Sequence, residues 1–148
     1  MDAQTATAIA SVSVALAVAL ITRRQWLTNR ATLKHLLFDR RYAIYERITA
    51  FIAEIMQSGR VSPGSDQQFL RDTKQAYFVF SCDRDVRTLV SEIYRHAVDL
   101  HALETELAGA TGEERVSNVA KQRAIKDWFS ETLNSMEGRF EKYLRLEH

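Results

Sequence analysis

Arginine and histidine side chains lie close together in one part of the sequence, and these are the residue types best suited to chemistry. Arg95 is followed directly by His96 and then by His101. A guanidinium binds anions, and an imidazole transfers protons near neutral pH. On a regular helix, residues six apart lie about 120° from alignment, so one helix does not bring Arg95 and His101 to one substrate. Two copies of the chain could do so. The simpler alternative is an ion pair of Arg95 with Asp99, one turn away.

Other patterns that carry chemistry are absent from the sequence. The single cysteine, Cys82, makes neither an intramolecular disulfide nor a cysteine metal cluster, and we interpret it as a small buried apolar residue. There is no two-histidine-plus-acid metal spacing, no phosphate loop and no nucleophile elbow. Paired acids such as Glu113 and Glu114 fall at expected helix starts, where the positive end of the helix dipole stabilises a negative charge. We therefore expect no metal and no cofactor.

Composition and periodicity predict an all-α chain with a four-helix-bundle-like domain at residues 23–145. One proline and five glycines in 148 residues favour helix, and the formal charge of +1 does not suggest a strongly basic nucleic-acid protein. Apolar residues recur at helical spacing in four segments, before Gly59, after Ser65, after Asp83 and after Gly112. Ser65 and Gln68 form a capping-box signature, and a short tail is expected after Gly138. Residues 146–148, Leu-Glu-His, resemble the start of a vector-encoded tag.

An uncharged segment at residues 3–22 predicts a membrane anchor. Twenty residues form a helix of about 30 Å, which matches the hydrocarbon core of a bilayer. Because the positive charges follow the apolar run and no cleavage site is present, we expect the segment to remain attached. A buried helix of a soluble protein is the alternative to a membrane span.

Small and hydroxyl-bearing residues in this segment predict helix–helix assembly. Alanine and serine recur every four residues, and such positions let helices approach closely. In a ring, some of them would line a channel, whereas in a closed dimer the polar residues would hydrogen-bond across the contact. The third alternative is that an alanine-rich segment shows such spacings by chance. The candidate oligomer or pore-lining residues are Thr7, Ser11, Ser13, Ala15 and Ala19.

The charged flank of the anchor predicts its orientation. Arg23, Arg24, Arg30 and Lys34 follow the span, and no lysine or arginine precedes it. The positive-inside rule then places the N-terminus outside and the C-terminal domain in the cytoplasm, which for a bacterium means a single-pass inner-membrane protein. The same four residues are candidates for binding lipid headgroups.

The run from Leu37 to Glu46, LFDRRYAIYE, resembles a family of small bacterial proteins that carry an N-terminal hydrophobic segment. Members also share a GRVS turn and an EIYRHAVDL run, which appear here at residues 59–62 and 92–100. The closing motif departs from the family, because Lys142 replaces an expected proline. The family has no assigned chemistry, so this resemblance implies architecture alone.

A short N-terminal span before a helical bundle is also similar to the membrane accessory protein of type VI-B CRISPR systems, a HEPN-like bundle that assembles into a pore. HEPN ribonucleases carry an arginine and, after four to six intervening residues, a histidine, and Arg95 with His101 fits that pattern. The resemblance implies RNA cleavage without metal, at an interface between two copies. The pattern has low specificity, since Arg30 and His35 also fit it and about one chance match is expected.

Three interpretations follow. The first is an oligomeric membrane protein that forms a pore or perturbs the membrane in bacterial defence or stress. The second is a HEPN-like ribonuclease tethered to the membrane, with RNA as its substrate. The third is a membrane-anchored scaffold that docks a partner protein. Membrane lipid and further copies of the chain are the expected partners in the first.

Overall fold

The computed structural model describes residues 3–80 and 84–145, with residues 3–14 described as backbone only. Over these residues the chain is all-helical, as the sequence predicts, and has no strand. The elements are α1 (Ala3–Ser58), α2 (Ser65–Thr73), the single turn α3 (Ala76–Val79), α4 (Arg84–Leu107) and α5 (Gly112–Leu144). Met1–Leu37 and Phe38–His148 form two separate compact units. The predicted tag residues 146–148 lie outside the described residues, as does Cys82.

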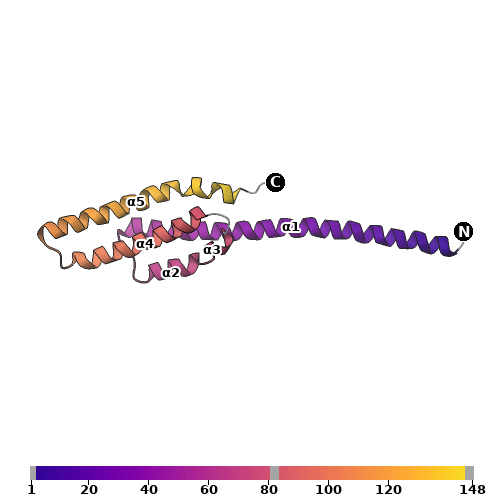
Figure 1. Ribbon diagram of the computed structural model, residues 1–148, viewed down its shortest axis with the longest axis horizontal. Helices are drawn as coiled ribbons and strands as arrows, with labels where there is room; N and C mark the ends of the chain where they lie inside the picture. The colour runs from indigo at the N-terminus through magenta and orange to yellow at the C-terminus, as the bar shows by residue number, and fades with distance from the viewer. Residues whose placement is uncertain (1–2, 81–83, 146–148) are drawn as a thin grey trace. The chain divides into compact units, whose positions relative to one another are not determined.

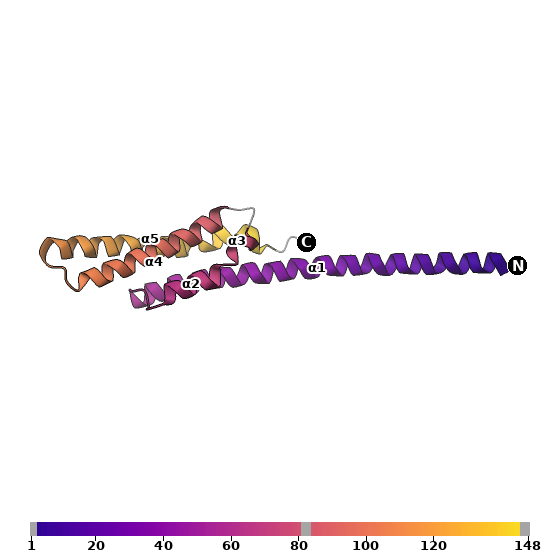
Figure 2. The ribbon, with the colours of Figure 1, turned by 60° about the horizontal axis from the view of Figure 1, so that its bottom comes forward.

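The second unit is a helical bundle, in which α4 and α5 lie side by side and run antiparallel (Figure 1; Figure 2). The short connection between them leaves no other arrangement easy to reach. α4 buries the predicted apolar stripe against the other helices. The buried members of this stripe are Val86, Leu89, Ile93, Ala97 and Leu100.

The C-terminal part of α1 supplies one wall of the core. Ile48, Ile52 and Ile55 are almost completely buried, and the ring of Phe51 stacks on Phe69 of α2 with centroids 4.5 Å apart. Gly59 ends α1 with a φ of 71°, a left-handed conformation that glycine adopts without strain. The chain then reverses, so that α2 can return along the bundle.

α5 differs from the sequence prediction in two ways. The apolar residues after Gly112, Val116 among them, predict a buried face, but Val116 is 72% exposed, whereas the polar Asn118 and Gln122 face the bundle. The amide of Asn118 donates to the carbonyl of Leu103 at 3.0 Å and accepts from Gln122 at 2.9 Å, so these polar groups are satisfied inside. The expected stop at Gly138 is also wrong, because α5 continues to Leu144.

The predicted capping box at the start of α2 is wrong as well. The helix begins directly at Ser65, after Gly64 with a φ of 78°, and no side-chain cap bond forms. The Ser65 hydroxyl donates instead to the carbonyl of Ser62 at 2.8 Å. Gln68 is likewise used elsewhere, since its amide donates to Asp72 at 2.8 Å.

In the part of the chain that the structure describes, none of the helices combines the length and the hydrophobicity that a membrane span requires. The predicted anchor begins at Ala3, so most of it lies in the part of α1 that is described as backbone only. The structure confirms that residues 3–22 are helical.

Candidate functional site

Arg95 and His101, the predicted catalytic pair, lie on α4 with both side chains exposed. Six residues of helix separate them by about 9 Å along the axis and turn them to different faces. The clefts described on the second unit include Arg95 but not His101. Arg95 forms no ion pair with Asp99 among the described contacts. The structure therefore does not bring the pair together within one chain.

His96, the neighbouring histidine, is held in the interface between α4 and α5. Its imidazole lies 4.1 Å from the indole of Trp128, measured between ring centroids, and its Nδ1 is buried without a hydrogen-bond partner. Burial lowers the pKa of His96, and the charge of Arg95 acts in the same direction, while Asp99 and Glu92 oppose it. Because its Nδ1 is buried between two helices, His96 is in a packing position, and this nitrogen is not at a surface where a substrate could reach it.

The candidate oligomer and lipid-binding residues belong to α1. Ala15 and Ala19 are exposed, and so are Arg23, Arg24 and Lys34. The guanidinium of Arg30 lies 5.4 Å from the ring centroid of Trp26, a cation–π contact on the helix surface. Thr7, Ser11 and Ser13 lie outside the residues whose side chains the structure describes.

The same part of α1 carries large apolar side chains that are exposed. Leu33 is 67% exposed and Trp26 is 58% exposed. Together with Leu37 they form what we call the exposed stripe, since the three residues are seven and four apart and share one helix face.

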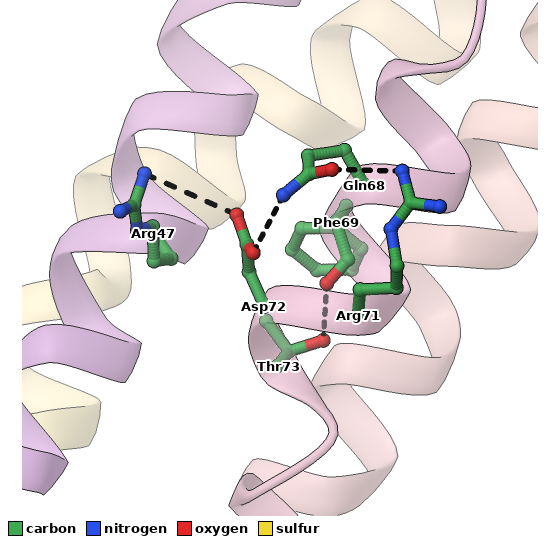
Figure 3. Close-up of polar contacts among 6 residues, drawn as sticks. All are labelled: Arg47, Gln68, Phe69, Arg71, Asp72 and Thr73. Carbon is green, nitrogen blue, oxygen red and sulfur yellow. Dashed lines mark hydrogen bonds and ion pairs between the residues drawn. The ribbon is translucent and has the colours of Figure 1, made fainter.

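A polar cluster joins the C-terminal part of α1 to α2 (Figure 3). Arg47 lies 3.9 Å from the carboxylate of Asp72, and Gln68 bridges Asp72 to Arg71 with hydrogen bonds of 2.8 Å on each side. Most of these groups are exposed, so the cluster contributes little to stability and forms no reactive centre.

The sequence reasoning missed a cleft on the surface of α3 and α4, which we call the arginine cleft. It has a volume of about 450 Å³. Its lining residues are Tyr77, Arg84, Arg87, Thr88, Ser91, Glu92 and Arg95. The signal that could have revealed it is the spacing of Arg84, Arg87 and Arg95, which repeats close to whole helical turns. In the part of the chain that the structure describes, no group of three or more histidine, cysteine or acidic residues is arranged to hold a metal ion.

The second unit is thus a helical-bundle domain, and the first unit, which is part of α1, carries exposed apolar side chains. No family model, curated protein or solved structure matches the chain. The two resemblances noted in the sequence therefore stay expectations.

Proposed function

We propose that this chain is a membrane-anchored helical-bundle protein that assembles with further copies of itself through α1. The observation that carries the proposal is the exposed stripe of Trp26, Leu33 and Leu37. On a regular helix these residues fall within about 60° of Ile44 and Ile48, further along α1. Ile44 and Ile48 are buried in the bundle, whereas the three residues that precede them on this face are not.

An uncovered apolar stripe of this kind needs a partner. Each large apolar side chain that leaves water contributes about 1.5–3 kcal/mol, so a stripe of three is a strong drive to association. We propose that a second copy of the chain covers the stripe. It would present the same three apolar residues, so the two stripes could pack against each other along parallel helices.

The N-terminal end of α1 supports a membrane location. Residues 3–22 are helical and uncharged, and Leu16, Leu20 and Ile21 are all more than half exposed. Lipid would cover these side chains. Arg23 and Arg24 follow the span, which favours an outside N-terminus and a cytoplasmic bundle.

Assembly inside the membrane is also the route to a pore or to perturbation of the bilayer. Ala15 and Ala19 are small enough for close helix contacts. Thr7 and Ser11, which lie within about 40° of one another on a regular helix, would supply the polar lining, whereas Ser13 lies on another face of the helix. The proposed output is therefore a channel or a packed cluster of anchors, with membrane lipid and further copies of the chain as partners.

The proposal is tested by extraction and by mass. Alkaline carbonate washing of membranes should leave the protein in the pellet, and the mass of the protein–detergent complex should correspond to more than one chain. Replacing both Val12 and Leu16 with arginine should release the protein, since Val12 lies at the centre of the 3–22 span, where an arginine costs about 2.5–3.5 kcal/mol. The matched control, Leu36→Arg outside the span, should stay in the pellet. Release of the unaltered protein by carbonate would contradict the membrane location.

A further inference from the structure

We propose that the arginine cleft on α3 and α4 binds a phosphate-bearing ligand. The cleft lies wholly within the second unit, so this inference does not depend on the anchor or on assembly. Three guanidiniums line it, from Arg84, Arg87 and Arg95, against one carboxylate, Glu92. The hydroxyls of Thr88 and Ser91 lie between them on the same face of the helix.

The charges of the three arginines are not neutralised by acidic side chains in the described part of the chain. None of them forms an ion pair in the part of the chain that the structure describes. The nearby acid Asp85 is paired instead with Lys142, at 3.8 Å. The Nε of Arg87 is buried and has no hydrogen-bond partner, so the protein leaves this guanidinium incompletely satisfied.

Their position also works against the stability of α4. The helix begins at Arg84, and Arg84 and Arg87 fall in its first turn, where the positive end of the helix dipole disfavours a cation. They are also three residues apart, a spacing at which like charges repel. An anion in the cleft would relieve both effects at once, which explains why the charges are tolerated there.

The chemistry of the cleft fits phosphate in particular. A guanidinium is planar and presents paired N–H donors that match two oxygens of a phosphate group. The guanidinium of Arg87 lies 5.0 Å from the ring centroid of Tyr77, so stacking holds it in place before a ligand arrives. A volume of about 450 Å³ is large enough for a headgroup or a small phosphate compound.

The binding test uses the full chain in a nonionic detergent, titrated calorimetrically with inorganic pyrophosphate at low salt. Saturable binding is expected, and higher ionic strength should weaken it. Changing both Arg84 and Arg95 to glutamine should weaken binding at least tenfold. The matched control changes Arg115 and Arg123 to glutamine, two exposed arginines on α5, and it should retain the affinity of the unaltered chain.

Arg87 provides a second, independent variant. Arg87→Lys keeps the charge but loses the paired donors, so it should also weaken binding, whereas a cleft that merely attracts anions would be unaffected. Circular dichroism establishes that each variant keeps its helix content. No saturable binding at millimolar pyrophosphate, or equal losses in the cleft pair and the control pair, would overturn the proposal.

Two sources of the phosphate group are separated by a further pair of probes. Glycerol 3-phosphate represents a soluble ligand, and dihexanoyl phosphatidate presents the same group on a lipid. Phe78, next to Tyr77, is 73% exposed and could contact acyl chains. Tighter binding of the lipid, lost in Phe78→Ser, would identify a headgroup, whereas equal binding of the two probes would identify a soluble phosphate compound.

Discussion

The imidazole of His96 on α4 packs against the indole of Trp128 on α5, with ring centroids 4.1 Å apart and planes inclined by 42°. Phe129 completes the aromatic contact on one side of the imidazole, at 6.4 Å. The buried Nδ1 has no partner, which a neutral imidazole tolerates as an unused acceptor but a charged one would not. The interface between α4 and α5 is thus built for the neutral form of His96.

The bundle should therefore lose stability as the pH falls below the ordinary histidine pKa of 6.5. Burial lowers the pKa of His96 in the folded chain, so the unfolded chain binds the proton first and the free energy of unfolding decreases in that range. Thermal unfolding of the full chain between pH 7.5 and pH 5 measures the effect. His96→Gln should flatten this pH dependence, whereas His101→Gln, an exposed site on the same helix, should leave it unchanged.

Phe140 holds the end of α5 to the rest of the bundle. It is completely buried, and its ring lies 5.4 Å from Tyr45 of α1 and 5.7 Å from Phe80, measured between centroids. Phe140→Ala should lower the free energy of unfolding by about 3–5 kcal/mol, because it leaves a cavity among aromatic rings. Val116→Ala, on an exposed part of α5, should cost less than about 0.5 kcal/mol. Equal effects in denaturant titrations would contradict this picture of the core.

α2 should depend on Phe69 and very little on the polar cluster of Figure 3. The Arg47–Asp72 pair is 3.9 Å apart, and the arginine side chain is 66% exposed, so Asp72→Asn should cost less than about 1 kcal/mol. Phe69→Ala removes the stack on Phe51 and should cost about 3–5 kcal/mol. The reverse order of the two effects, again from denaturant titrations, would show that the polar cluster holds the helix.

The helices and most of the core could be predicted from the sequence because their signals are local. On α4 the period of Val86, Leu89, Ile93, Ala97 and Leu100 fixes one buried face. On α5 the same reasoning failed at Asn118 and Gln122. Their burial depends on the hydrogen bond from Asn118 to the carbonyl of Leu103 on α4. A contact between two helices cannot be predicted from the residue pattern within one of them.

The exposed stripe and the arginine cleft also differ in how far the sequence predicts them. The exposed stripe follows from periodicity along one helix, so its residues could be proposed from sequence. The arginine cleft needs Tyr77 of α3 beside α4, and that arrangement arises only from the turn between them. In the sequence, Arg95 is a candidate because of its spacing to His101, whereas the structure places it in one cleft with Arg84 and Arg87.

The ribonuclease hypothesis makes a sharp prediction because Arg95 and His101 are both exposed. If the pair cleaves RNA across an interface between two copies, the assembled chain should cleave RNA in the presence of a metal chelator. Arg95→Ala and His101→Ala should each abolish the activity and leave helicity and assembly intact, since neither side chain is in the core. His35→Ala, the histidine of the second Arg–His match, is the control. No cleavage by the unaltered assembly would remove the hypothesis.

Assembly through α1 should respond to charge on one helix face only. Leu33→Glu places a carboxylate in the exposed stripe, and burying it between two copies would cost several kcal/mol. Thr28 lies roughly opposite the stripe on a regular helix, and its hydroxyl is bonded to the carbonyl of Arg24 in the same helix, at 3.0 Å. Thr28→Glu therefore adds the same charge at a position that the interface does not use. We expect Leu33→Glu to reduce the number of chains in the detergent-solubilised complex and Thr28→Glu to leave it unchanged.

The membrane part of the interface is tested by size instead of charge. Replacing Ala15 and Ala19 with leucine adds bulk where close contact between helices is proposed, while the span becomes more apolar and stays in the membrane. The number of chains per complex should change, as measured by mass in mild detergent. If Leu33→Glu alone alters the number, the copies associate through the stripe of Trp26, Leu33 and Leu37, and the helices within the bilayer are separate. A complex of one chain, unaffected by any of these substitutions, would contradict assembly and with it the pore.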